Sequence, residues 1–174
     1  MKKGKIGLGA KITVALLLPL GGACGQQSLD LVEVAVEKAY TAEHLPAADL
    51  HRALAEADSA AYVLFDVRQP EEYDVSRIGQ AVQVDPEAAA ADFIAAHGQA
   101  IAGKKAVFYC SVGYRSSKLL KRVESAALEA GAVSLANLRG GIFRWHNEGF
   151  PLEANSDTAK VHPYDRHWGK LLRE

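Results

Sequence analysis

The strongest constraint on the fold is the alternation of short apolar runs with segments of helical spacing. Four such runs read as buried strands, at residues 61–66, 81–84, 105–109 and 133–138. The segments between them carry apolar residues three and four positions apart, the pattern of amphipathic helices. Alternating strands and helices fold into a parallel sheet with right-handed crossovers and helices on both faces. The sequence therefore predicts an α/β fold with a parallel sheet of four to five strands.

Capping residues place the helices between these strands. Asp85 is expected to cap a helix with Pro86 in its first turn, and Gly98 is expected to end it. Gly131 is expected to end a helix over residues 116–130. Three shorter helices are predicted: one after Pro46 with an apolar stripe of Leu50, Leu54 and Ala57, one from Gln69, and one from Gly140 through Trp145.

Cys110 stands in the segment that links the third strand to the following helix. It opens a six-residue loop that Arg115 closes. Ligands of parallel sheets bind beyond the carboxyl ends of the strands, and Cys110 directly follows one. The backbone N–H groups of such a loop, together with a helix N-terminus, can point at one sulfur atom and favour its thiolate form. The sequence therefore predicts nucleophilic chemistry at the Cys110 sulfur rather than a buried, inert cysteine.

Three motifs in this order resemble the rhodanese family of sulfurtransferases. They are Asp66-Val-Arg68 with Glu71-Glu72-Tyr73, the loop Cys110-Ser-Val-Gly-Tyr-Arg115, and Leu138-Arg-Gly-Gly-Ile-Phe-Arg-Trp145 with Gly149-Phe-Pro151. The resemblance implies a rhodanese-like fold over residues 43–154. Two positions depart from the family pattern, since Arg77 stands where the family commonly has a His, and Gln80 where it has a Gly. These departures leave the nucleophile in place and indicate a differently shaped neighbouring loop.

The resemblance implies that Cys110 carries sulfur between two small molecules without a cofactor. Its thiolate would attack the outer sulfur of a donor such as thiosulfate, and the persulfide would pass that sulfur to cyanide or a thiol, with ping-pong kinetics. Arg115 would either attract an anionic donor or brace the loop, and Gly113 would permit its sharp turn. Tyr114 would line the pocket mouth or shield the loop from water. The substrate-binding residues implied are Ser111, Val112, Gly113, Tyr114, Arg115 and Ser116.

The residues around this loop are expected to have structural roles. Asp66 and Arg68, at the end of a buried strand, are expected to pair with neighbours and support the loops. Trp145 is expected to belong to the core. Because the loop has only Arg115 to attract a charged donor, we expect modest efficiency with thiosulfate and better use of a persulfide or polysulfide.

Two other functions fit a cysteine in such a loop. A phosphatase or arsenate reductase would need a longer loop with its Arg at position 116, where this chain has Ser116. A persulfide carrier or redox-sensing module would keep the thiol without turnover, since exposed, acidic thiols oxidise readily. We therefore predict a sulfurtransferase, with the non-turnover module as the alternative.

Residues 1–23 have the pattern of a secretory signal peptide. A basic start is followed by the apolar run 12–20, which is too short to span a bilayer. Leu20-Gly-Gly-Ala-Cys24 resembles a bacterial lipoprotein box, in which the Cys is lipidated and becomes the new N-terminus. An ordinary signal peptide cleaved near Ala23 is the alternative. Either interpretation predicts an exported, periplasmic protein, and the first adds a membrane anchor on Cys24.

The rest of the chain is expected to be one domain with an extension at each end. Residues 24–42 form the N-terminal segment, with a polar tether at 25–30. Within 31–40 the valines alternate as in a strand, whereas the acidic residues have helical spacing, and of the two we expect a short helix. Without residues 1–23 the chain has 16 basic and 21 acidic side chains, which argues against nucleic acid as a partner. The expected partners are small sulfur donors and acceptors, and a monomer is expected.

Residues 155–174 form a C-terminal tail outside the domain. His162 and His167 have no further metal ligands at suitable spacing, so no metal site is predicted. Tyr164 and Trp168 are instead expected to dock on the domain surface. With Cys24 lipidated, a single thiol would remain and no internal disulfide could form.

Overall fold

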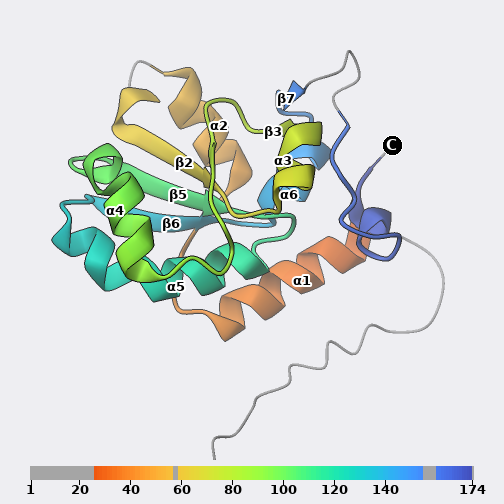
Figure 1. Ribbon diagram of the computed structural model, residues 1–174. Coiled ribbons are helices and arrows are strands. Elements are labelled where there is room, and N and C mark those ends of the chain that lie inside the picture. The colour runs from red at the N-terminus through yellow and green to blue at the C-terminus, as the bar shows by residue number, and fades with distance from the viewer. Residues whose placement is uncertain (1–25, 57–58, 155–159, 174) are drawn as a thin grey trace, which may run out of the picture.

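Five strands form one parallel sheet at the centre of the molecule (Figure 1). The computed structural model describes residues 26–56, 59–154 and 160–173. The strands lie in the order β1-β6-β5-β2-β4, and each neighbouring pair is parallel. This confirms the predicted α/β fold and the number of strands. The bounds are β1 (Glu43–Leu45), β2 (Tyr62–Asp66), β4 (Val82–Gln83), β5 (Lys105–Tyr109) and β6 (Ser134–Leu138).

Helices cover both faces of this sheet, as predicted (Figure 1). Helices α4 and α5 pack on the face that carries Phe65 and Phe108. Helices α1, α2 and α6 pack on the opposite face, which carries Leu64 and Val107. The bounds are α1 (Gln26–Ala39), α2 (Ala47–Ala55), α3 (Pro70–Val75), α4 (Ala90–Ile101), α5 (Tyr114–Glu129) and α6 (Gly141–Asn147), with short 3-10 helices η1 (Ser59–Ala61) and η2 (Trp168–Leu171).

The edge strand β1 was not predicted from the sequence. Its three residues are Glu43, His44 and Leu45, which are too polar and too few to form an apolar run. Backbone pairing with β6 defines the strand, and the N–H of Arg139 donates to the Leu45 carbonyl at 2.9 Å just beyond it. The pairing therefore depends on β6, a segment far away in the sequence.

The prediction for helix α4 was wrong at both ends. Asp85 does not cap it, because its side chain accepts the N–H of Glu87 at 2.8 Å in a local turn. The helix begins five residues later, at Ala90. It also continues through Gly98 to the buried Ile101, whose packing in the core outweighs the low helix propensity of glycine.

The helix after Cys110 begins earlier than predicted. Helix α5 starts at Tyr114, two residues before Ser116, and Gly113 is its N-cap residue. The expected stop holds, since Gly131 has a φ of +96° just after the helix. The early start places Arg115 and Ser116 in the first helical turn.

Helix α1 confirms the helix expected at 31–40 and corrects the tether expected at 25–30. The helix starts at Gln26, so residues 26–30 are helical. Leu29, Val32 and Val36 lie on one side of it and are buried in the core. The apolar side chain of Leu29 explains the correction, because it continues the buried stripe into the segment expected to be a tether.

Short strands outside the main sheet position the segment after α3. β3 (Ser76–Arg77) pairs antiparallel with β7 (Glu153–Ala154). The Arg77 Nε lies 3.4 Å from Oε2 of Glu153, and its guanidinium lies over the ring of Tyr73. Gln80, which stands where the family commonly has Gly, adopts a φ of +63°, the left-handed conformation that glycine adopts most easily.

The tail docks on the domain, as predicted for Tyr164 and Trp168. Trp168 packs against the core, and the Arg115 guanidinium lies over the Tyr164 ring at 4.9 Å from its centre. The expectations for the signal peptide, Cys24, Gly25 and Ala57 concern residues outside the described parts of the chain. In those parts, no helix combines the length and the apolar character needed to cross a membrane.

Candidate active site

Cys110 lies at the carboxyl end of β5, as the sequence predicted. It is 1% exposed, and its sulfur accepts the N–H of Gly113 at 3.3 Å. The next N–H groups along the chain belong to Tyr114, Arg115 and Ser116, the first turn of α5. First-turn N–H groups have no partner within their helix and carry its positive dipole end. The thiol therefore lies where negative charge on sulfur is stabilised.

Gly113 allows the chain to turn from strand to helix over so few residues. Its φ is +96°, and a Cβ there would lie 2.9 Å from the Asn137 amide nitrogen. The Ser116 hydroxyl donates to the Asn137 Oδ1 at 2.6 Å, and the Ser117 hydroxyl donates to the Gly113 carbonyl at 2.7 Å. Asn137 was missed as a site residue. The signal was present, because it is a polar residue between the apolar Ala136 and Leu138 of strand β6.

The first turn of α6 supports the cysteine loop through hydrogen bonds to its backbone. The N–H groups of Ile142 and Phe143 donate to the carbonyls of Cys110 and Ser111 at 2.9 and 3.0 Å. Gly141, with a φ of +56°, allows this approach, since a Cβ there would overlap the Cys110 carbonyl oxygen. Gly141 of the third motif therefore allows α6 to hold the backbone of Cys110 and Ser111.

Arg115 braces the loop through a two-pronged ion pair. Its guanidinium donates to both carboxylate oxygens of Glu72 at 2.7 and 2.8 Å and to the Ser111 hydroxyl oxygen at 3.0 Å. Burial disfavours the charged guanidinium, but the bonds to Glu72 and the charge of Cys110 outweigh it and hold the pKa of Arg115 above its ordinary value. Of the two roles expected for Arg115, the structure shows bracing.

Glu72 belongs to the first motif, but no role was predicted for it. Its side chain is 2% exposed and also accepts the Gln69 N–H at 3.0 Å, which closes a capping box on α3. Burial raises the pKa of this carboxyl, but Arg115, Gln69 and Ser111 together bring it below its ordinary value. Glu72 is therefore the anion that neutralises Arg115 beside the cysteine.

Asp66 and Arg68 form a buried support, as predicted. Both side chains are fully buried, and the guanidinium donates to Asp66 Oδ2 at 2.6 Å and to the Ser76 carbonyl at 2.6 Å. The pKa of Tyr109, beside this pair, is raised far above its ordinary value by burial and then by Asp66. The pair therefore holds the backbone after β2 and the Ser76 carbonyl.

The remaining predicted side chains divide between the core and the surface. Val112 is 6% exposed and packs in the core, and Trp145 does the same while its indole N–H donates to the Pro151 carbonyl at 2.8 Å. Tyr114 is half exposed, and its ring meets that of Tyr40 edge to face at 5.7 Å. Burial, followed by the bond to Tyr114, raises the pKa of Tyr40 to about 12.

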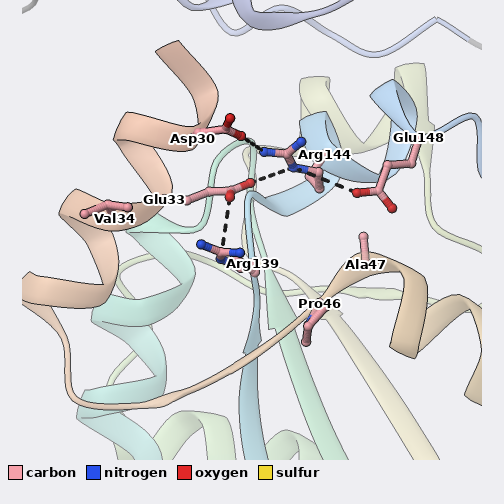
Figure 2. A pocket seen from close by; sticks show the side chains of 8 residues that line it. All are labelled: Asp30, Glu33, Val34, Pro46, Ala47, Arg139, Arg144 and Glu148. Atoms are coloured by element: carbon pink, nitrogen blue, oxygen red, sulfur yellow. Dashed lines mark hydrogen bonds and ion pairs between the residues drawn. The ribbon is translucent and has the colours of Figure 1, made fainter. Parts of the chain in front are cut away.

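A separate charged pocket lies between α1, α2 and α6. Figure 2 shows Arg144 directed at Asp30, Glu33 and Glu148, and Arg139 directed at Glu33. The buried Glu33 carboxylate accepts from Arg144 at 2.7 Å. These ion pairs fasten α1 to α6, whose first N–H groups hold the cysteine loop. The lining residues are Asp30, Glu33, Val34, Pro46, Ala47, Arg139, Arg144 and Glu148.

The described residues hold no group of three or more His, Cys, Asp or Glu side chains that could bind a metal ion. His162 accepts the N–H of Tyr164 at 3.1 Å, and the ring of His167 contacts Trp168. Both histidines of the tail therefore take part in its local structure.

Residues 46–148 match the rhodanese-like domain family. A comparison with curated protein sequences finds no match.

Solved structures share the fold. A rhodanese-related protein from Thermoplasma volcanium is 22% identical, with a TM-score of 0.50 and coverage of 64% of this chain and 97% of that one. A rhodanese-like domain protein from Staphylococcus aureus is 23% identical, with a TM-score of 0.50 and coverage of 66% and 99%. The As-Sb reductase from Leishmania major is 20% identical, with a TM-score of 0.55 and coverage of 62% and 79%. With the family match covering more than half of its length, the chain belongs to the rhodanese-like domain family.

Proposed function

We propose that this protein is a sulfurtransferase that carries sulfur on Cys110. The observation that supports this most directly is the position of the Cys110 sulfur, which accepts the Gly113 N–H at the N-terminus of α5. A second sulfur bound there would carry its negative charge next to the free N–H groups of the first helical turn. Because the loop is short, it can stabilise negative charge on one sulfur atom.

In the first step Cys110 takes sulfur from the donor. Its thiolate attacks the outer sulfur of thiosulfate, a new S–S bond forms, and the old S–S bond breaks. The electron pair of the broken bond leaves with sulfite, so no external oxidant or reductant is needed. The ion pair of Glu72 and Arg115 keeps the loop in place while the negative charge moves from the Cys110 sulfur to the outer sulfur of the persulfide.

In the second step the acceptor removes the outer sulfur. The persulfide first takes up a proton from water on its outer sulfur. The carbon of cyanide then attacks that sulfur, the C–S bond forms, and the S–S bond breaks. The outer sulfur returns its proton to water and leaves as thiocyanate, while the Cys110 sulfur keeps the electron pair of the broken bond as the thiolate that starts the next cycle. The cycle has two displacement steps and predicts ping-pong kinetics.

The donor is proposed to be weakly charged. Both carboxylate oxygens of Glu72 are bonded to Arg115, so the positive charge expected to attract thiosulfate is largely compensated. An organic persulfide, R–S–S–H, would react in the same way, with R–S⁻ as the leaving group. We expect kcat/KM to be higher for such a donor than for thiosulfate, and a clear preference for thiosulfate would contradict this.

An oxyanion-reducing or phosphatase activity is less well supported. Such sites surround a tetrahedral anion with a loop one residue longer, closed by an Arg at position 116. Here Ser116 occupies that position and its hydroxyl is bonded to Asn137. The likeness to the As-Sb reductase concerns the fold at 20% identity.

Thiocyanate formation from thiosulfate or a persulfide plus cyanide tests the proposal. We expect turnover by the purified protein, and none by Cys110→Ser, whose nearly isosteric side chain keeps the fold. Uptake of one sulfur per chain without turnover would instead identify a persulfide carrier. No uptake at all would overturn the sulfur-based function.

We also propose that residues 1–23 direct export and that Cys24 carries a lipid. The support is the sequence pattern around Leu20-Gly-Gly-Ala-Cys24. Expression in a bacterium with a lipidation system, followed by membrane fractionation and mass analysis of the N-terminal peptide, tests this. Cys24→Ala should release the protein from the membrane fraction. An unmodified Cys24, or a retained residue 1, would contradict it.

A further inference from the structure

The C-terminal tail reaches the active-site loop although it lies outside the matched domain. The match to the family ends at residue 148, whereas Tyr164 stacks on Arg115 at 4.9 Å (the tail is blue in Figure 1). Arg115 in turn bonds to Ser111, which follows the nucleophile. Tyr164 is therefore separated from the cysteine by one side chain.

The tail is anchored on both sides of Tyr164. Before it, Val161 is buried and the Lys160 carbonyl accepts the Ser76 hydroxyl at 2.8 Å. After it, Leu171 is buried and its carbonyl accepts the Asn147 amide at 2.8 Å. These anchors hold the intervening turn against the domain.

The turn keeps Tyr164 in a conformation that a side chain rarely adopts. Its φ is +64°, in the left-handed region. The His162 ring accepts its N–H at 3.1 Å, and the Asp165 side chain accepts the N–H groups of His167 and Trp168 at 2.7 and 2.8 Å. Strained residues persist where the surroundings fix them, and they concentrate at functional sites.

The ring lies against one face of Arg115. Nη1 and Nη2 of the guanidinium donate to Glu72 and to the Ser111 hydroxyl. The central carbon of the guanidinium lies over the Tyr164 ring, 4.9 Å from its centre, so the ring occupies the approach to this face. The guanidinium also interacts with the charge of Cys110, which contributes to the raised pKa of Arg115. An anion that reached this face would therefore lie next to the reacting sulfur.

We propose that the tail completes the active site, and that Tyr164 is a specificity-determining residue whose ring covers Arg115 and disfavours anionic reagents at Cys110. Applied to sulfur transfer, and resting on the proposed function, this selects organic persulfides over thiosulfate. The Cys110 thiolate forms a bond to the outer sulfur of R–S–S–H, and R–S⁻ leaves as the S–S bond of the donor breaks.

Alkylation of Cys110 by a neutral and an anionic reagent tests the proposal without any need for sulfur transfer. The rate constants for iodoacetamide and iodoacetate are measured on the full chain, by mass spectrometry of the peptide that contains Cys110. Their ratio cancels differences in thiolate fraction and in general access. The variants are Tyr164→Gly, which removes the ring and relieves the backbone strain, and Tyr164→Phe, which keeps the ring.

Tyr62→Ala is the matched control. It removes a ring that Lys105 contacts at 5.1 Å, at the opposite end of β2 and β5 from the cysteine. Its effect on the alkylation ratio should be nil, while its effect on stability reports the cost of losing a comparable aromatic contact.

We expect Tyr164→Gly to raise the iodoacetate to iodoacetamide ratio about two- to fivefold, the range for an ordinary cation–π contact. The rise should shrink at high salt, because screening weakens the pull of the uncovered charge. Tyr164→Phe should keep the wild-type ratio. An unchanged ratio in Tyr164→Gly, or an equal rise in Tyr62→Ala, would overturn the proposal, and a rise in Tyr164→Phe would overturn the role of the ring.

The same variants connect the proposal to the donor. Tyr164→Gly should shift relative kcat/KM from the organic persulfide toward thiosulfate by a similar factor. An unchanged donor preference beside a raised alkylation ratio would overturn the donor class alone. If the wild-type protein transfers no sulfur, the proposed function fails, while the alkylation ratio still decides the role of Tyr164.

Discussion

At the scale of single residues, the site depends on compensation of charge beside the nucleophile. A free Arg115 guanidinium would attract anions. Here Glu72 binds it through two hydrogen bonds, and it lies over the Tyr164 ring. The result is a loop that is held rigidly and presents little net charge. This explains why the residue that looks most like a substrate-binding group in the sequence serves as a brace.

Glu72→Gln should destabilise the protein at neutral pH and flatten its response to acid. The partly buried Arg115 would lose its counter-charge, at a cost of about 1–3 kcal/mol. The pKa of Glu72 is below its ordinary value of 4.5 in the folded state, so its contribution is complete above that value and is lost as pH falls through the lower one. Urea unfolding of both proteins at neutral and acidic pH measures this difference.

Glu87→Gln is the control for that experiment. Glu87 also faces two basic partners, Lys118 and Arg122, but its side chain is 68% exposed. Solvent screens such pairs, so the loss should stay under about 1 kcal/mol. Equal losses at neutral pH for the two variants would show that burial of the Glu72 pair contributes nothing.

At the scale of secondary-structure elements, the loop is held between the starts of two helices. Gly113, the N-cap residue of α5, donates its N–H to the Cys110 sulfur, and α6 supplies N–H groups to the carbonyls of Cys110 and Ser111. The second contact needs a backbone approach that Gly141 permits. Gly141 is thus part of the support of the Cys110 backbone.

Gly141→Ala should damage the site more than a comparable glycine substitution elsewhere. Its Cβ would overlap the Cys110 carbonyl oxygen, which adds about 1–3 kcal/mol to the cost of the left-handed conformation. Gly149→Ala is the control, because its φ of +77° is similar and no atom lies within 4 Å of the added Cβ. It should cost only about 1–2 kcal/mol. Thermal unfolding and Cys110 alkylation rates of both variants decide the point, and equal effects would refute it.

At the scale of the whole molecule, both extensions are parts of the folded unit. Helix α1 buries Leu29, Val32 and Val36, and its acidic side chains pair with Arg144 of α6 and with Arg139 just before that helix (Figure 2). The tail packs η2 against α1 and brings Tyr164 to the loop. The domain is therefore completed by segments from both sides of it in the sequence.

Val36→Ala should destabilise the protein by about 1–3 kcal/mol, because the deleted methyl groups leave a gap in the core. Val34→Ala makes the same chemical change two residues away on the same helix, where the side chain is 39% exposed. It should change stability by less than about 0.5 kcal/mol. Equal results in chemical denaturation would mean that α1 does not dock as described.

Local patterns predicted the parts of the fold that depend on neighbouring residues. The four apolar strands, the stop at Gly131 and the position of Cys110 follow from patterns within a few residues. The start of α4 was wrong because Asp85 favours a turn over a cap, and β1 was missed because its identity comes from pairing with β6.

The partners of the site could not be predicted in this way. Glu72 and Arg115 are 43 positions apart, and their pairing depends on how α3 and α5 meet in three dimensions. Tyr164 lies beyond the family motifs and reaches Arg115 only because the tail folds back. The sequence therefore predicted the position of Cys110, whereas the tertiary structure identified the residues that contact its loop.

Mass spectrometry of the intact protein after reaction with a sulfur donor tests the central claim most directly. We predict that Cys110 gains the mass of one sulfur atom, that cyanide removes it, and that an equal amount of thiocyanate forms. Cys110→Ser should show none of these changes. An unchanged mass with every donor, or thiocyanate released equally by Cys110→Ser, would contradict the account.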